Sequence, residues 1–259
     1  MKSPRISALV LGLCVFSVTA ATPFELAAQE EDVPAVYASY FQCDPTRLAR
    51  IDSLMTTFWG PIQDRYVTSG KVTAWGWLGH HTGADWDRVF YSVSPDINDA
   101  VDTNDQSLSD AIKENAQLVR ETFEGCPRHE DYIWQRVGGS QASAEFATAR
   151  PAAGLSIYYE CDQSREQRAD EIVLTDFAPS LNRLVESGDM NSWAWLEHVV
   201  GGKYRRLLVT DGRDARTLIG AIGKLTDELR IQEPKAFTEL TGICSSHQDV
   251  IWSMRITKP

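Results

Sequence analysis

The chain has 259 residues, with 25 basic and 36 acidic side chains and a formal net charge of −11. A surface this acidic repels phosphate backbones and anionic membranes, which argues against nucleic-acid binding. No stretch approaches the roughly twenty uninterrupted apolar residues that a membrane-spanning helix needs, so we predict no membrane span.

The first 20 residues have the pattern of a cleaved secretory signal. Lys2 and Arg5 precede an apolar stretch over residues 6–18, and small side chains at 18–20 mark a cleavage site. We therefore expect a secreted or periplasmic protein whose formal charge falls to −13 once the signal is removed. An acidic, alanine-rich segment over residues 21–34 follows the signal.

Beyond the signal, the cysteines are even in number. They are Cys43, Cys126, Cys161 and Cys244. An even count in an exported chain predicts disulfides. No Cys-x-x-Cys pair supports a structural zinc site, and we predict no metal.

The mature chain contains one unit twice. A shift of 118 positions, without a gap, places Cys43 on Cys161 and Cys126 on Cys244, together with about two dozen further identities. The sequence therefore predicts repeat 1 over 35–136 and repeat 2 over 154–259. The Gly-, Ala- and Ser-rich residues 137–153 are interpreted as a linker.

Within repeat 1, apolar alternation predicts strands over 36–42, 72–79, 88–93 and 131–137. Helical spacing predicts one helix from residue 48 to Gly70, kinked at Pro61, and a second over 96–123. The order β-α-β-β-α-β is the ferredoxin-like plan of an α+β protein.

This plan also predicts how the cysteines pair. In the strand order 4-1-3-2, the last strand lies antiparallel to the first. Cys43 ends the first strand and Cys126 precedes the last one, so both should lie at the same end of the sheet. We predict the disulfides Cys43–Cys126 and Cys161–Cys244, each within its own repeat.

The tandem unit resembles the dimeric α+β barrel superfamily, including its antibiotic-biosynthesis-monooxygenase-like and NIPSNAP-like members. The resemblance rests on the strand-to-helix entry at 37–44, the stretch 70–88, and their counterparts at 156–162 and 188–206. It implies two ferredoxin-like sheets placed face to face around a shared interior. A fused pair can build this barrel alone, so we expect a monomer or a weak homo-oligomer.

Two tryptophan pairs occupy equivalent strands. They are Trp75 with Trp77, and Trp193 with Trp195. Alternation places both rings of a pair on one face of the strand. We expect that face to line the barrel interior and to bind a flat apolar ligand. The alternative is that the rings simply fill the interior as core.

Four further residues are candidates for chemistry. His80 and His198 stand at strand ends as general bases or haem ligands, or merely as exposed histidines near turns. Arg88 and Arg206 begin strands and are candidates to hold a carboxylate or polarise bound oxygen. The alternative for each arginine is a structural ion pair with an acid.

The leading functional hypothesis is a small-molecule pocket between the two sheets. It either binds only or catalyses a cofactor-free oxygenation or isomerisation of a small apolar or aromatic molecule. The first alternative is a haem-binding barrel that uses His80 or His198. The second is a non-enzymatic exported interaction protein, which an exposed strand edge would favour.

Overall fold

The computed structural model describes residues 33–141 and 151–258; the predicted signal peptide and most of the acidic segment after it lie outside these residues. Each repeat has the predicted β-α-β-β-α-β order. The strands are β1 (Ala35–Gln42), β2 (Ala74–Thr82), β3 (Arg88–Ser94), β4 (Arg128–Gln141), β5 (Ala153–Glu160), β6 (Ser192–Val200), β7 (Arg206–Gly212) and β8 (Ser246–Lys258). Among the described residues, no helix combines the length and apolarity needed to cross a bilayer.

The helices cover one face of each sheet. They are α1 (Leu48–Leu54), α2 (Gly60–Thr68), α3 (Ile97–Gly125), α4 (Glu166–Ile172), α5 (Ala178–Glu186), α6 (Ala215–Gln232) and α7 (Pro234–Ile243). A short 3₁₀ turn, η2 (Gln163–Arg165), precedes α4. Two π-helical turns, η1 (Met55–Trp59) and η3 (Val173–Phe177), join α1 to α2 and α4 to α5.

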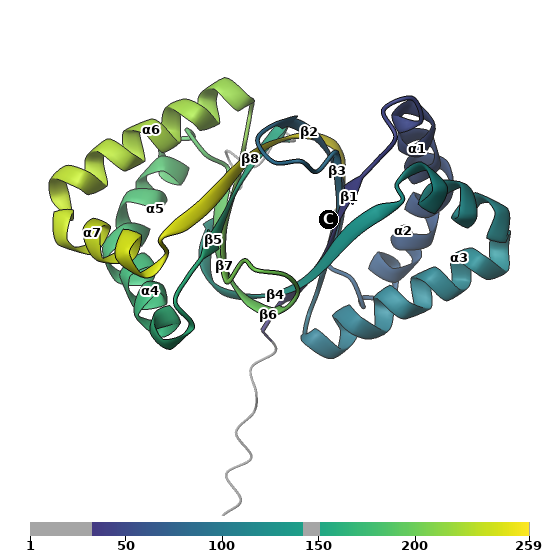
Figure 1. The fold of residues 1–259 in the computed structure, drawn as a ribbon, viewed down its shortest axis with the longest axis horizontal. Coiled ribbons are helices and arrows are strands. Elements are labelled where there is room, and N and C mark those ends of the chain that lie inside the picture. Colours follow the sequence, from purple (N-terminus) through teal and green to yellow (C-terminus); the bar gives the residue numbers. More distant parts are fainter. Residues whose placement is uncertain (1–32, 142–150, 259) are drawn as a thin grey trace, which may run out of the picture. The chain divides into compact units, whose positions relative to one another are not determined.

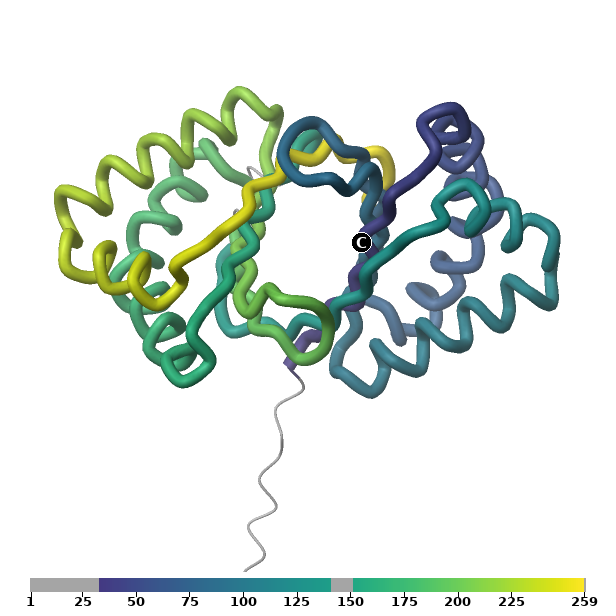
Figure 2. The backbone as a smooth tube through the Cα atoms, in the orientation of Figure 1, coloured from purple at the N-terminus to yellow at the C-terminus, as the bar shows by residue number. Residues whose placement is uncertain are grey.

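The two sheets close into a single barrel. Each repeat contributes antiparallel strands in the expected order, β4-β1-β3-β2 and β8-β5-β7-β6, and the seams between the repeats are β2–β8 and β4–β6. Figure 1 shows the strands as a ring seen end-on, with α1–α3 outside it on one side and α4–α7 on the other. In Figure 2 the yellow β8 leaves its own half to lie along β2. The predicted α+β fold is confirmed.

The segment interpreted as a linker begins later than predicted. β4 continues to Gln141, and Gly138 and Gln141 pair with Trp195 and Ser192 of β6. The linker prediction was wrong over residues 137–141, because glycine at this seam has a packing role. A Cβ atom on Gly138 would collide with the side chain of Leu174.

The first helix of each repeat is widened at its proline. Proline has no N–H to donate, so the α-helical pattern is interrupted at Pro61. The N–H of Gly60 bonds the carbonyl of Met55, five residues back, which is the π-helical spacing. α2 then ends before Gly70, whose φ of +78° is readily adopted by glycine.

Both predicted disulfides are formed. Cys43 bonds Cys126 and Cys161 bonds Cys244, each with a sequence separation of 83. Each bridge ties the end of the first strand of its repeat to the start of the last one.

The barrel interior is filled by the protein's own aromatic rings. The largest are Tyr40, Trp86, Tyr132, Trp134, Tyr158, Tyr204 and Trp252. The rings touch one another: the centroids of Tyr132 and Trp134 are 4.9 Å apart, and those of Tyr40 and Trp86 are 4.5 Å apart. The open centre of the ring in Figure 1 is thus packed with side chains. The prediction of a ligand pocket between the sheets was wrong.

Candidate functional site

The tryptophans predicted to line the barrel lie on its outer face, under the helices. Trp75 and Trp77 belong to the hydrophobic core between sheet and helices of repeat 1, and Trp193 and Trp195 to that of repeat 2. Two effects fix this orientation. The helices supply acceptors for the indole N–H groups, whereas the inward face of β2 has no room for them. Tyr91 packs so closely over Gly76 that a Cβ atom there would overlap its ring.

Each indole N–H of these four tryptophans has a partner on a helix. Trp75 donates to Asp64 at 2.9 Å and Trp77 to Asp52 at 2.8 Å. In repeat 2, the corresponding donations are from Trp193 to Asn182 at 2.8 Å and from Trp195 to Asp170 at 2.7 Å. A buried indole with its N–H satisfied in this way fixes a helix on a sheet. The four rings therefore belong to the cores between sheet and helices and do not face the barrel interior.

Arg88 and Arg206 complete the same structural clusters. The guanidinium of Arg88 binds both carboxylate oxygens of Asp52, at 2.7 and 2.9 Å, and Arg206 binds Asp170 at 2.6 and 2.7 Å. Burial alone would raise the pKa of Asp52, but the bonds from Arg88 and Trp77 outweigh it and lower that pKa. Both arginines are thus committed to buried ion pairs, which was the alternative stated for them.

The two histidine candidates lie in different environments. His80 is exposed, and its ring stands 6.4 Å from that of Trp252. His198 is half-buried against Tyr132 and Trp134, with its Nδ1 2.7 Å from Arg205. Burial and, after it, the charge of Arg205 lower the pKa of His198, which keeps its ring neutral at pH 7.

Neither histidine provides a haem site. An axial ligand needs a free ring nitrogen that faces a cavity large enough for the macrocycle. The Nδ1 atom of His198 is occupied by Arg205, and its other ring nitrogen is buried beside packed aromatic rings. His80 is exposed to solvent and does not line the cavity beside Trp59, the one beside Arg255 or the one beside Trp86. The residues do not fit haem.

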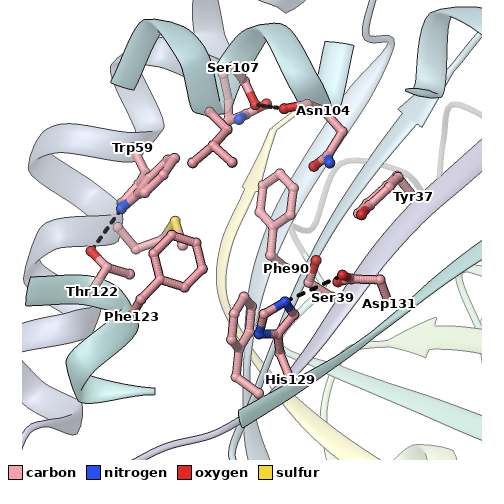
Figure 3. Close-up of a pocket in the computed structure, with 14 residues that line it drawn as sticks. Tyr37, Ser39, Trp59, Phe90, Asn104, Ser107, Thr122, Phe123, His129 and Asp131 are labelled. Atoms are coloured by element: carbon pink, nitrogen blue, oxygen red, sulfur yellow. Dashed lines mark hydrogen bonds and ion pairs between the residues drawn. The ribbon is translucent and has the colours of Figure 1, made fainter. Parts of the chain in front are cut away.

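A cavity of about 160 Å³ lies between the sheet and the helices of repeat 1. Its floor is the outer face of β1, β3 and β4, and its roof is η1, α2 and α3. Figure 3 shows Trp59 and Thr122 on the helical side and Ser39 and Asp131 on the strand side. The π-helical turn η1 helps to form the roof, because both Met55 and Trp59 face the cavity.

The lining is polar as well as aromatic. Its aromatic walls are Phe41, Trp59, Phe90 and Phe123. Its polar side chains without formal charge are Tyr37, Ser39, Gln63, Asn104, Ser107 and Thr122, which we call the polar positions. Gln63 is the most unusual of them, because a long amide side chain that is only 3% exposed faces the cavity.

Asp131 and His129 form the charged edge of the cavity. His129 Nε2 lies 3.4 Å from Asp131 Oδ2. The other oxygen, Oδ1, is buried and accepts no hydrogen bond from any described residue. Burial, followed by the negative charges of Asp131 and Asp105, raises the pKa of Tyr37 to about 12. The phenol therefore stays protonated at neutral pH.

Repeat 2 shows what the same place looks like without the polar positions. The residues equivalent to them are Leu155, Ile157, Leu181, Ile222, Leu225 and Leu240. All six belong to, or pack against, the hydrophobic core of repeat 2. The two copies share one framework, but one is lined by polar groups where the other is filled by aliphatic ones.

Comparison with known proteins identifies the fold. No protein-family model and no curated protein sequence matches the chain. Among solved structures, a proposed monooxygenase from Lactobacillus acidophilus aligns with a TM-score of 0.57 at 7% identity, covering 87% of this chain and 95% of that one. An anthrone oxidase-like protein aligns with a TM-score of 0.56 at 9% identity, over 88% and 94% of the two chains.

A mutant chlorite dismutase from Candidatus Nitrospira defluvii aligns at 0.54 and 12% identity, over 89% and 92% of the chains. Each of these alignments runs through both repeats and the closed barrel. The chain is a fused dimeric α+β barrel. At these identities the likeness establishes the fold of the fused barrel and nothing about its chemistry.

Sequence reasoning missed the polar positions of this fused barrel. The candidate residues came from positions that are identical in both repeats. Those positions form the structural clusters of Trp77 with Arg88 and of Trp195 with Arg206. A signal was nevertheless present in the sequence. At core-facing places such as 39, 63 and 107, one copy is polar and the other aliphatic.

Proposed function

We propose that the fused barrel is an exported protein that binds a small planar organic molecule in the cavity of repeat 1. The observation that carries the proposal is that the polar positions line a cavity in repeat 1, whereas the equivalent positions of repeat 2 form an aliphatic core. Buried polar groups cost stability unless they are paired, so their retention here supports a binding role. The two disulfides are compatible with an oxidising, secreted or periplasmic location.

The size of the cavity limits the ligand. A cavity of about 150 Å³ holds one benzene molecule in a well-studied case, and the cavity of repeat 1 is about 160 Å³. The ligand, or the part of it that enters, is therefore the size of a single ring. The aromatic walls favour a flat molecule, and the amide of Gln63 offers it N–H donors and a carbonyl acceptor.

The geometry supports binding more than catalysis. The charged side chains that the described residues place in the lining, His129 and Asp131, have counterparts in His247 and Asp249, which are 3.8 Å apart in repeat 2. Repeat 2 keeps this His–Asp pair although an aliphatic core stands there in place of the polar positions. The pair is therefore not specific evidence that the cavity of repeat 1 catalyses a reaction. The closed barrel also disfavours the interaction-protein alternative, because every described strand has a partner on both sides.

The methionines allow a direct test. Met55 lines the cavity, whereas Met190 lies in the core of repeat 2. In protein labelled with ¹³C at the methionine methyl groups, benzyl alcohol and benzylamine are expected to shift the NMR signal of Met55 saturably and to leave that of Met190 in place. The proposal fails if neither probe shifts Met55, or if both methionines respond alike.

A matched variant separates the cavity from nonspecific binding. Ser39→Ile with Ser107→Leu, the filled variant, carries the residues of repeat 2 and is expected to lose the response of Met55. The control is Thr210→Val, which removes a buried hydroxyl in the other repeat and should keep that response. A filled variant that responds like the wild type would contradict the proposed site.

Gln63→Leu is expected to raise the free energy of unfolding by about 1 kcal/mol. The change removes a buried amide that faces the cavity and introduces the residue that repeat 2 has at this place, Leu181. Urea denaturation followed by circular dichroism measures the difference. A loss of more than about 1 kcal/mol would show that the Gln63 amide is a structural group, paired within the fold.

A further inference from the structure

The lining of the cavity of repeat 1 contains a carboxylate but no basic side chain of lysine or arginine among the described residues, and this indicates the class of ligand. The inference rests on the proposed binding function. The charged side chains that the described residues contribute to the lining are Asp131 and His129. An anionic ligand would have no guanidinium or ammonium group to pair with and would face a carboxylate instead.

The two carboxylate oxygens of Asp131 differ in their hydrogen bonding within the protein. Oδ2 lies 3.4 Å from His129, whereas Oδ1 is buried and accepts no well-formed hydrogen bond from the described residues, although the Tyr37 phenol lies close enough to Asp131 to interact with its carboxylate. A buried carboxylate oxygen strongly favours a hydrogen-bond donor, and a charged donor more than a neutral one. Since Asp131 borders the cavity, a bound molecule can supply that donor.

The remaining lining agrees with a cationic or N–H-bearing ligand. Four aromatic side chains form the walls, and the faces of aromatic rings attract cations. The Tyr37 phenol, whose pKa is raised to about 12, remains neutral and can accept a second hydrogen bond from the ligand. Gln63 of α2 also lines the cavity, where its amide can bind a polar substituent of the ligand.

We propose that the cavity of repeat 1 selects small aromatic amines, with the ammonium group bound at Asp131 Oδ1 and the ring held between the aromatic walls. Asp131 is half-exposed at the edge of the cavity, so the amine enters from solvent and keeps its charge. Neutral molecules of the same shape bind more weakly, and carboxylates of the same shape are excluded.

The experiment uses three probes of similar shape with different charge: benzylamine, benzyl alcohol and benzoate, at pH 8, where ordinary histidines are neutral. Their dissociation constants are measured through the methyl signal of Met55 in the full chain. Benzylamine is expected to bind about tenfold more tightly than benzyl alcohol, the difference between a charged and a neutral hydrogen bond. Benzoate is expected not to shift the signal.

Asp131→Asn is expected to weaken benzylamine binding about tenfold while changing the affinity for benzyl alcohol by less than about twofold. Asp249→Asn, the same change in repeat 2, is the control and should alter neither. If the three probes bind equally, or if Asp131→Asn has no effect, the preference for amines is wrong and the proposed cavity remains. If none of them shifts Met55, the binding function and the ligand class fail together.

Discussion

Replacing Arg206 with methionine is expected to lower the free energy of unfolding by about 3–5 kcal/mol, the usual cost of breaking a buried ion pair. Arg206 is only 3% exposed and holds Asp170 with two bonds, and its third nitrogen lies 3.1 Å from Glu166. The methionine leaves the Asp170 carboxylate with only the N–H of Trp195. Urea denaturation of wild type and variant measures the loss.

Two further variants test the cause of this loss. Arg213→Met removes an arginine whose side chain is 77% exposed, and should change the free energy of unfolding by less than about 0.5 kcal/mol. Adding Asp170→Asn to Arg206→Met removes the orphaned charge but keeps an acceptor for Trp195, and should recover part of the stability. A loss below about 1 kcal/mol for Arg206→Met would show that the pair does not hold helix and sheet together.

Removing either disulfide is expected to lower the free energy of unfolding by about 4 kcal/mol, because each joins two cysteines with a sequence separation of 83. The equal loops predict equal losses for the pairs Cys43→Ala with Cys126→Ala and Cys161→Ala with Cys244→Ala. Since a domain of this kind is stable by only about 5–15 kcal/mol, the variant without both bridges should be largely unfolded at 37 °C. Thermal unfolding followed by circular dichroism measures each variant.

Reductant provides the control for the disulfide variants. It should destabilise the wild type and each single-bridge variant, and should leave the variant without bridges unchanged. The prediction is wrong if the midpoint of the wild type does not move under conditions in which a thiol assay finds all four cysteines reduced.

Most of the fold could be predicted from the sequence because the unit is duplicated. Because Cys43 and Cys126 recur at one fixed offset as Cys161 and Cys244, one plan had to satisfy both copies, and it also required the observed pairing. The end of the first repeat was harder to predict. The Gly and Ser residues near 138 have the composition of a loop, and only their pairing with β6 from the other copy makes them a strand.

The faces of the strands could not be predicted from alternation. Trp75 and Trp77 alternate with Gly76 and Leu78, and either set suits an interior. The choice depends on groups that are distant in sequence: Asp52 and its neighbours on the helices, which accept the indole N–H bonds, and the aromatic rings from other strands that already occupy the barrel. The cavity of repeat 1 could not be predicted for a related reason. The residues that are identical in both repeats belong to the structural framework, whereas the polar positions differ between the repeats.

The seams β2–β8 and β4–β6 join halves that belong to one polypeptide. An assembly of two identical chains must open the same hollow in both halves and accept the loss of core twice. Covalent fusion removes this symmetry. Repeat 2 can keep a dense aliphatic core and, through the seams, stabilise repeat 1, in which a cavity takes the place of part of the core. Evolution of the binding half can therefore proceed at a stability cost that the other half absorbs.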